Sequence, residues 1–373
     1  MHQSPISRAG LLILSAGLFC LSARAGAFPA QGNTPPQSSK EDRRVSRALS
    51  EPLVTIVDKT HPSPTGDPHD YVSFARYYWP DPARPDGLPF IQKDGHPNTA
   101  WIERGDSRRL EAMIRTVEAL ADGWVRLHRP DCPSRADAWV RAWFLDPATR
   151  LKPDFSYAQI RMGRNDNRGS ASGLIDTRGL LRVAEALSAL HGAPGMSPEA
   201  EEAARTWFTA YLDWLLTSRS GRTEHRAKNN HGSWYLAQAV AISRFLGKTD
   251  QALALAREDF ERIDAQIEPD GSQPLETARV DGLSYSLFNL EAQLTLARVA
   301  NPLGIDLWAY TAPRGGSLKK ALEYLRPYDT EPKGWPHNQL AAVKPGFLAP
   351  LLQAAAQLDR NPPGESPGPS GTR

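Results

Sequence analysis

The chain has 373 residues and a formal net charge of +2, and 40% of its residues are hydrophobic. A charge this small gives no indication of a nucleic acid or a membrane surface as a partner. The length allows one large domain or two ordinary ones, with a sizeable core.

The first 25 residues have the layout of a secretory signal peptide. Arg8 precedes an apolar run at residues 10–21, and an Ala-Arg-Ala cleavage site ends at Ala25. We therefore expect an exported protein, periplasmic or secreted. The run is too short to span a bilayer, and no other segment is apolar enough to do so. Cleavage leaves Cys132 as the remaining cysteine, so no intramolecular disulfide is expected.

Segments rich in Pro, Gly and Ser flank the rest of the chain. Residues 26–42 are interpreted as a flexible lead-in and residues 361–373 as a disordered tail, with one domain at residues 43–360 between them. Within this domain apolar residues recur at three- and four-residue steps, which predicts amphipathic helices. These helices cover residues 110–127, 177–190, 198–215, 233–246, 249–267, 283–300, 316–325 and 338–358.

The pattern is almost entirely helical, because alternating strand patterns are nearly absent. Amphipathic helices joined by short turns suggest stacked helical hairpins, in a toroid or a solenoid. No fixed-period repeat is present, which counts against a tandem-repeat array.

Several common catalytic motifs are missing from the sequence. It contains no HExxH, CxxC or GxSxG motif and no glycine-rich phosphate loop. This argues against a metalloenzyme, a kinase, a dinucleotide enzyme or a serine hydrolase. We expect neither a metal nor another cofactor.

An aromatic stretch lies between residues 69 and 98, in "HDYVSFARYYWPDP" and "DGLPFIQKDGHPN". Tyr71, Tyr78 and Trp79 occur here among Pro and Gly turns rather than at helical spacing. Aromatic side chains on loops offer flat apolar faces for sugar rings. The alternative is a loop held in place by its own aromatic residues.

A polar, glycine-bearing stretch follows at residues 155–179, "FSYAQIRMGRNDNRGSASGLIDTRG". Gln159 and Arg168 are among its many hydrogen-bond donors, which suit an anionic ligand rich in hydroxyl groups. The alternative is an ordinary solvated loop.

The stretch "KNNHGSWYLAQ", residues 228–238, places two asparagines and a histidine before an apolar run. One asparagine is explained as a helix N-cap. The cap leaves Asn230, His231 and Trp234 without an explanation.

The stretch "ETARVDGLSYSLFNLEAQ", residues 276–293, places Arg279 six residues before Tyr285. Tyr285 lies off the leucine stripe of the helix that follows. The alternative reading is a tyrosine packed at the edge of the core with its hydroxyl group hydrogen-bonded.

Together these stretches resemble the alginate lyase family of polysaccharide lyases, over residues from about 61 to 352. The resemblance is most specific at "KNNHGSW" and "ETARVDGLSYSLFNL". It is closer to the group that degrades alginate and glucuronan, judged by "HDYVSFARYYWPDP" and "IDTRGL". The chain departs from the founding alginate lyases at Gly232-Ser233-Trp234, where they usually have Ser-Tyr-Trp, and its Arg-to-Tyr spacing differs slightly. The substrate therefore stays open between alginate and glucuronan.

The resemblance implies an all-α fold, an (α/α) toroid that forms an incomplete barrel, and β-elimination on an anionic uronate polysaccharide. It implies that Asn230 and His231 donate hydrogen bonds to the substrate carboxylate. It also implies that Tyr285 transfers the proton, with its pKa lowered by Arg279. Either Tyr285 or His231 acts as the base. The residues expected to contact the substrate are Tyr71, Tyr78, Trp79, Gln159, Arg168, Asn229 and Trp234. We expect a monomer that binds neither nucleic acid nor a membrane.

Two other functions are compatible with these residues. A glycoside hydrolase on a similar toroid would need two carboxylates that face the substrate, for which Asp176, Glu276 and Asp281 are candidates. A non-catalytic polysaccharide-binding protein would keep the binding surface without turnover.

Overall fold

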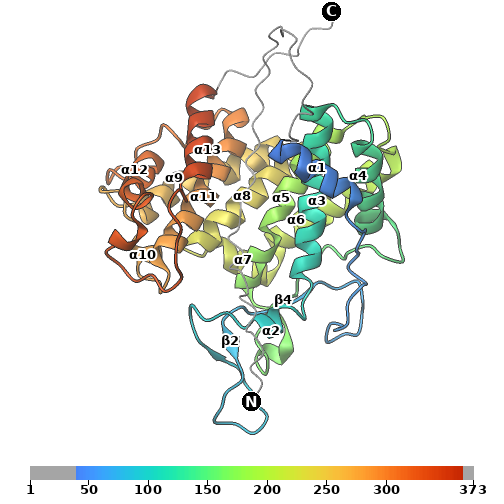
Figure 1. Ribbon diagram of the computed structural model, residues 1–373, viewed down its shortest axis with the longest axis horizontal. Helices are drawn as coiled ribbons and strands as arrows, with labels where there is room; N and C mark the ends of the chain where they lie inside the picture. The colour runs from blue at the N-terminus through green and yellow to red at the C-terminus, as the bar shows by residue number, and fades with distance from the viewer. Residues whose placement is uncertain (1–38, 364–373) are drawn as a thin grey trace, which may run out of the picture.

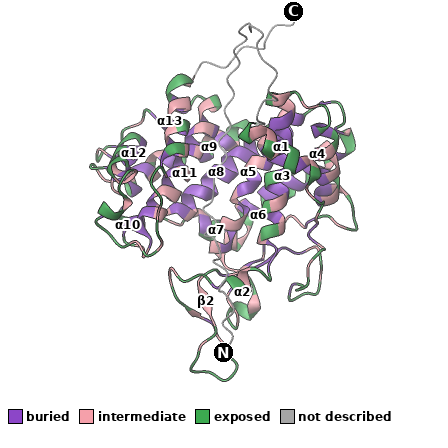
Figure 2. Ribbon diagram, viewed as in Figure 1, coloured by how far each residue is buried: buried purple, intermediate pink, exposed green. Residues whose placement is uncertain are grey.

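The computed structural model describes residues 39–363, so the expected signal peptide lies outside the described residues. Four helices form the inner row of the molecule and pack side by side in chain order (Figure 1). They are α3 (Ser107–Leu127), α5 (Leu180–Leu190), α8 (Asn230–Phe245) and α11 (Gly282–Ala300). Helix α8 is buried on nearly every side, as the purple ribbon at the centre of Figure 2 shows.

An outer row of helices packs against this inner row. It contains α1 (Lys40–Ser50), α4 (Cys132–Val140), α6 (Pro198–Thr217), α9 (Thr249–Gln266), α12 (Leu318–Leu325) and α13 (Ala349–Arg360). The two rows make an open ring of helical hairpins. The predicted (α/α) toroid is confirmed.

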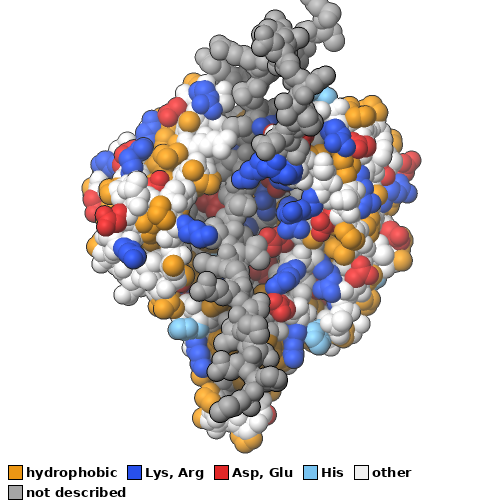
Figure 3. All heavy atoms as spheres, viewed as in Figure 1, with side chains coloured by type: hydrophobic (Ala, Val, Ile, Leu, Met, Phe, Trp, Pro, Cys, Tyr) orange, Lys and Arg blue, Asp and Glu red, His pale blue; other side chains and the backbone are white. Residues whose placement is uncertain are grey.

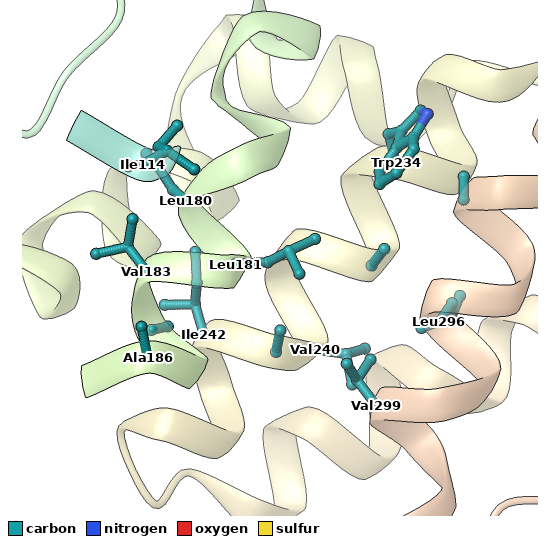
Figure 4. Packing of buried hydrophobic residues seen from close by; sticks show 14 of the residues in the cluster. Ile114, Leu180, Leu181, Val183, Ala186, Trp234, Val240, Ile242, Leu296 and Val299 are labelled. Carbon is teal, nitrogen blue, oxygen red and sulfur yellow. The ribbon is translucent and has the colours of Figure 1, made fainter. Parts of the chain in front are cut away.

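Aliphatic side chains from neighbouring inner helices fill the core (Figure 4). Leu181 of α5, Val240 of α8 and Val299 of α11 are each at most 2% exposed. They come from the apolar positions that predicted the helices, so the periodicity in the sequence corresponds to contacts between neighbouring helices.

Ion pairs also link the inner helices. Arg182 of α5 lies 3.2 Å from Glu118 of α3, and Arg298 of α11 lies 2.6 Å from Glu185 of α5. On the face shown in Figure 3, basic and acidic side chains lie close together near the midline. Because a buried charge without its partner is costly, each pair constrains how two helices pack.

A separate loop region lies below the toroid in Figure 1. Its strands β1 (Val72–Phe74) and β4 (Tyr157–Ile160) pair in parallel, and β2 (Tyr78–Trp79) and β3 (Ile91–Gln92) form an antiparallel hairpin.

The described residues also form shorter helical segments in several parts of the molecule. The short α-helices are α2 (Thr99–Ile102), α7 (Arg219–His225) and α10 (Pro274–Thr277). A π-helical segment spans Arg141–Leu145, and 3₁₀ segments span Asn165–Asn167, Ala171–Gly179, Asn301–Leu303, Arg326–Tyr328 and Pro332–Gly334.

The boundaries of the first and last helices differ from the sequence-based expectation for reasons visible in the sequence. Helix α1 begins at Lys40, inside the expected lead-in, because Ser39 and Asp42 form a capping box. The last helix begins at Ala349 rather than near residue 338. Pro345 cannot continue a helix, and Gly346 follows with φ at 79°. Between residues 39 and 363, no helix has the length and apolar character needed to cross a bilayer.

Candidate active site

The N-terminus of α8 carries the Asn-Asn-His turn. The side chain of Asn229 caps the helix and accepts a hydrogen bond from the backbone N–H of His231 at 3.4 Å. Asn229 therefore serves as the cap, which places Asn230 and His231 in the first helical turn. The imidazole of His231 is 23% exposed and can be reached from solvent.

A buried carboxylate orients His231. Nδ1 of the imidazole lies 2.5 Å from Oε1 of Glu224, which is on α7 and only 5% exposed. With its Nδ1–H donated to this carboxylate, the imidazole keeps Nε2 as its second nitrogen, available to take a proton. A histidine oriented by a carboxylate is a common arrangement for a general base.

Asn230 is bound to a second carboxylate. Its backbone N–H and its Nδ2 each donate to Glu276 of α10 at 2.7 Å, and the residue is 1% exposed. This differs from the expectation that the Asn230 amide faces the substrate, because one of its two amide hydrogens is already used. Burial raises the pKa of Glu276, while Asn230 and the charges of Arg279 and His231 oppose the rise. The charges of Arg279 and His231 thus act on the carboxylate that Asn230 binds.

Arg279 and Tyr285 lie against each other, as their spacing suggested. The guanidinium carbon of Arg279 is 3.9 Å from the centre of the Tyr285 ring, a cation–π contact. Nε and Nη2 of Arg279 donate to Asp94 at 3.3 and 2.9 Å. The Tyr285 hydroxyl group donates to the hydroxyl oxygen of Tyr77 at 3.1 Å. Both partners come from the hairpin region, about 200 residues earlier in the chain.

The expectation that Tyr285 has a lowered pKa is wrong. Burial raises the pKa of Tyr285 well above its ordinary value, and the charge and hydrogen bond of Tyr77 add to the rise. Arg279 does favour the phenolate, but its effect is smaller. Tyr285 is therefore held in its protonated form, so it has a proton to donate and would have to lose that proton before it could act as a base.

The loop after β3 packs tightly onto the segment between α10 and α11. Gly95 has φ at 76°, and a Cβ there would lie 2.7 Å from Cγ2 of Val280 and 2.9 Å from Cδ2 of Leu340. Only glycine fits this approach without a shift of its neighbours. The loop brings Asp94 onto Arg279.

Two residues expected to contact the substrate are buried instead. Tyr71 is 0% exposed and donates to Asp176 at 3.1 Å. Trp234 is 5% exposed and its ring centre lies 5.3 Å from that of Phe288. Both aromatic side chains are used for packing, so the structure places neither of them where a polysaccharide could reach its face.

Tyr78 and Trp79 are half-buried on the hairpin. Arg161 lies over the Tyr78 ring at 4.9 Å, and Nε1 of Trp79 donates to the carbonyl of His96 at 2.8 Å. Both side chains thus help to hold the hairpin region in place. Each is also partly exposed, so neither the sugar-binding interpretation nor the structural interpretation of this stretch is excluded.

Gln159 and Arg168 lie on the polar loop of the same region. Gln159 donates to Asp176 at 2.8 Å and has φ at 51°, which is uncommon outside glycine. Arg168 is exposed. No described contact joins either residue to the cluster around Glu276.

The three carboxylates considered for a hydrolase are each held by hydrogen bonds. Asp176 accepts from Tyr71, Ser73 and Gln159, and Glu276 accepts from Asn230, as above. Asp281 accepts from Gln339 and from the backbone N–H of Ala341. Their contacts are to different groups, so they do not form a facing pair.

His231 and Arg279 are partly exposed. An apolar hollow of about 320 Å³ exists elsewhere, lined in part by Phe74 and Trp101, and it contains none of the candidate catalytic residues. Arg279 is 26% exposed, similar to His231.

Within residues 39–363, no group of three or more His, Cys, Asp or Glu side chains is arranged to hold a metal ion.

Three residues of this site were not foreseen from the sequence. Glu224 lies seven residues before His231. An acidic side chain this close in the sequence was the signal that could have identified it as the partner of the histidine. Tyr77 and Asp94 belong to the aromatic stretch that was noticed, but nothing local connects them with Tyr285 and Arg279. Only the fold brings them together.

The comparisons with known proteins agree with one another. The sequence profile of the family described as alginate lyase matches residues 55–335. A crystal structure of an alginate lyase from Bacteroides ovatus is 32% identical with a TM-score of 0.79, over 88% of this chain and 89% of that one. A variant of alginate lyase A1-III from Sphingomonas species A1, complexed with tetrasaccharide, is 17% identical with a TM-score of 0.51, over 79% and 77%, which supports the fold alone. A search of curated proteins finds no match.

Proposed function

The chain belongs to the alginate lyase family and is a polysaccharide lyase, and from this premise we propose that it is an exported enzyme that cleaves alginate by β-elimination. The product would carry a C4=C5 double bond at its new non-reducing end. The residues around Glu276 support this reaction. The N-terminal layout of residues 1–25 supports export.

The difficult step is removal of the proton on C5 of the uronate. That proton is weakly acidic until the neighbouring carboxylate is neutralised and the developing negative charge is stabilised. The electron pair of the C5–H bond then forms the C4=C5 double bond. The C4–O bond breaks, and its oxygen leaves with a proton supplied by the enzyme.

In our proposal Arg279 binds the substrate carboxylate. Asp94 takes Nε and Nη2 of the guanidinium, which leaves Nη1 for the substrate. The N-terminus of α8, which carries His231, adds positive potential. These groups act at the charge that grows during the reaction.

His231 takes the C5 proton and Tyr285 protonates the leaving oxygen. The 2.5 Å contact with Glu224 supports the first role, because it orients the imidazole and stabilises the imidazolium that forms. The raised pKa of Tyr285 supports the second role, because the hydroxyl group keeps its proton until the oxygen leaves. The contact between Glu224 and His231 is the single observation that carries this assignment of the base.

The proposal is tested by measuring ultraviolet absorbance of the C4=C5 product with polymannuronate, polyguluronate and glucuronan as substrates. We expect absorbance to rise with at least one of the two alginate polymers, because the 32% identical structure is an alginate lyase. The rate should be equal with and without EDTA, since Arg279 can neutralise the carboxylate. Turnover of glucuronan alone would overturn the choice of alginate. New reducing ends without absorbance would identify a hydrolase, and no product would indicate a binding protein.

Export is checked on the same preparation. Protein recovered from the periplasm or the medium is expected to begin at Gly26, after cleavage at Ala25. An intact N-terminus on a protein retained inside the cell would contradict export without affecting the lyase assignment.

A further inference from the structure

Residues 225–229, the last residue of α7 and the segment that connects α7 with α8, run along one face of α9. It lies between Glu224 and the Asn230–His231 pair, so its path sets the position of each. Three residues of α9 contact it, at positions 258, 262 and 266. Residues spaced by four lie on one side of a helix, so this face of α9 follows the segment along its length.

Arg262 makes the central contacts. Its Nη1 donates to the carbonyl of Ala227 at 2.6 Å, and its Nη2 donates to the carbonyl of His225 at 3.1 Å. The side chain is 13% exposed, and its Nε lies 3.9 Å from the fully buried carboxylate of Asp259. A planar guanidinium can hold two carbonyl groups in a fixed geometry, which a lysine cannot do.

The ends of the segment are held by the other two residues. Nε2 of His225 lies 2.5 Å from Oε2 of Glu258. Nε2 of Gln266 donates to the carbonyls of Lys228 and Asn229 at 2.9 and 3.2 Å. Arg262 and Gln266 together bind four of the five carbonyl groups between residues 225 and 229.

Gly232 leaves the space that the guanidinium occupies. A Cβ at this position would lie 2.2 Å from Nη1 of Arg262 and 2.1 Å from the carbonyl oxygen of Ala227. Neither approach is possible without a shift. The glycine that follows the Asn-Asn-His turn in this chain is thus matched to the arginine on α9.

We propose that Arg262 is a positioning residue for the elimination reaction: by fixing the carbonyl groups of His225 and Ala227, it sets the geometry between Glu224 and His231. The inference rests on the proposed role of His231 as the base. Arg262 itself touches no substrate. Its effect is on the placement of the imidazole, and small errors of placement are costly in catalysis.

The test compares Arg262→Met and Arg262→Lys with Arg257→Met, a matched control at an exposed position of the same helix. Arg262→Met should lower kcat by about a hundredfold, the cost of a misplacement of about 1 Å, with little change in KM. Arg262→Lys should lose less, because its ammonium group can hold one carbonyl but not both. Arg257→Met should behave as wild type. Melting temperatures and circular dichroism identify how much of each variant is folded.

A double-mutant cycle with Gly232→Ala completes the test. The added methyl group displaces the same guanidinium and carbonyl, so the two changes should be strongly non-additive, and the double variant should resemble the single ones. Arg262 variants that melt at lower temperature but keep wild-type kcat once folded would show a purely structural role and overturn the proposal. Additive losses would do the same. Inactivity of the wild-type enzyme on every uronate polymer would instead contradict the proposed function itself.

Discussion

Replacing Tyr285 with Phe is expected to lower turnover by about two to four orders of magnitude, the usual range for loss of a general acid–base group. The change removes one hydroxyl group and keeps the ring that stacks on Arg279 at 3.9 Å. The fold and the binding of the substrate carboxylate should therefore be preserved. Steady-state kinetics should show the loss in kcat, with KM nearly unchanged.

Tyr77→Phe is the matched control for this variant. It removes the other hydroxyl group of the Tyr77–Tyr285 hydrogen bond but leaves the proton donor in place. A much smaller loss is expected. Equal losses in the two variants would mean that the hydrogen bond matters, rather than proton transfer by Tyr285. Wild-type turnover of Tyr285→Phe would return Tyr285 to a packing role.

Replacing His231 with Gln should reduce turnover by a similar factor, about two to four orders of magnitude. An amide cannot take the C5 proton, whatever its orientation. Glu224→Gln should give a smaller loss, because the imidazole remains while the charge that orients it is removed. Both measurements use the ultraviolet assay at saturating substrate.

A uronide with fluoride in place of the oxygen on C4 separates the two roles. Fluoride leaves without being protonated, so the acid is no longer needed whereas the base still is. Tyr285→Phe should recover most of its turnover on this substrate, and His231→Gln should not. The reverse result would assign Tyr285 as the base. In that case the pKa of the Tyr285 hydroxyl group would have to fall when the bound substrate displaces Tyr77 from it.

Most of the helical scaffold could be predicted, because most of its helices bury an apolar stripe. Helix α3 shows this directly, since Leu110, Met113 and Val117 recur at helical spacing and are all buried. The start of α8 was placed three residues late, at residue 233, because its first turn is polar. Helix α7 was missed, since its seven residues are too short for a periodic signal.

The site could be predicted only where its residues are close in the sequence. The Asn-Asn-His turn and the Arg279–Tyr285 pair are local features, and each was found. The hydrogen-bond partners of these side chains could not be predicted, because they are distant in the sequence. Glu276 is 46 residues from Asn230, and Asp94 is 185 residues from Arg279. The pKa of Tyr285 was misjudged for the same reason, since burial and a distant tyrosine outweigh the neighbouring arginine.

The contact between Asp94 and Arg279 means that two carboxylates share one guanidinium once a substrate is bound. Asp94 takes Nε and Nη2, and the substrate carboxylate is left with Nη1. Because the loop holds Asp94 in place, its carboxylate has a high effective concentration there and stays when the product leaves. The positive charge that Arg279 offers is therefore divided between the two, so the carboxylate of the product is held less tightly than it would be by an unpaired guanidinium.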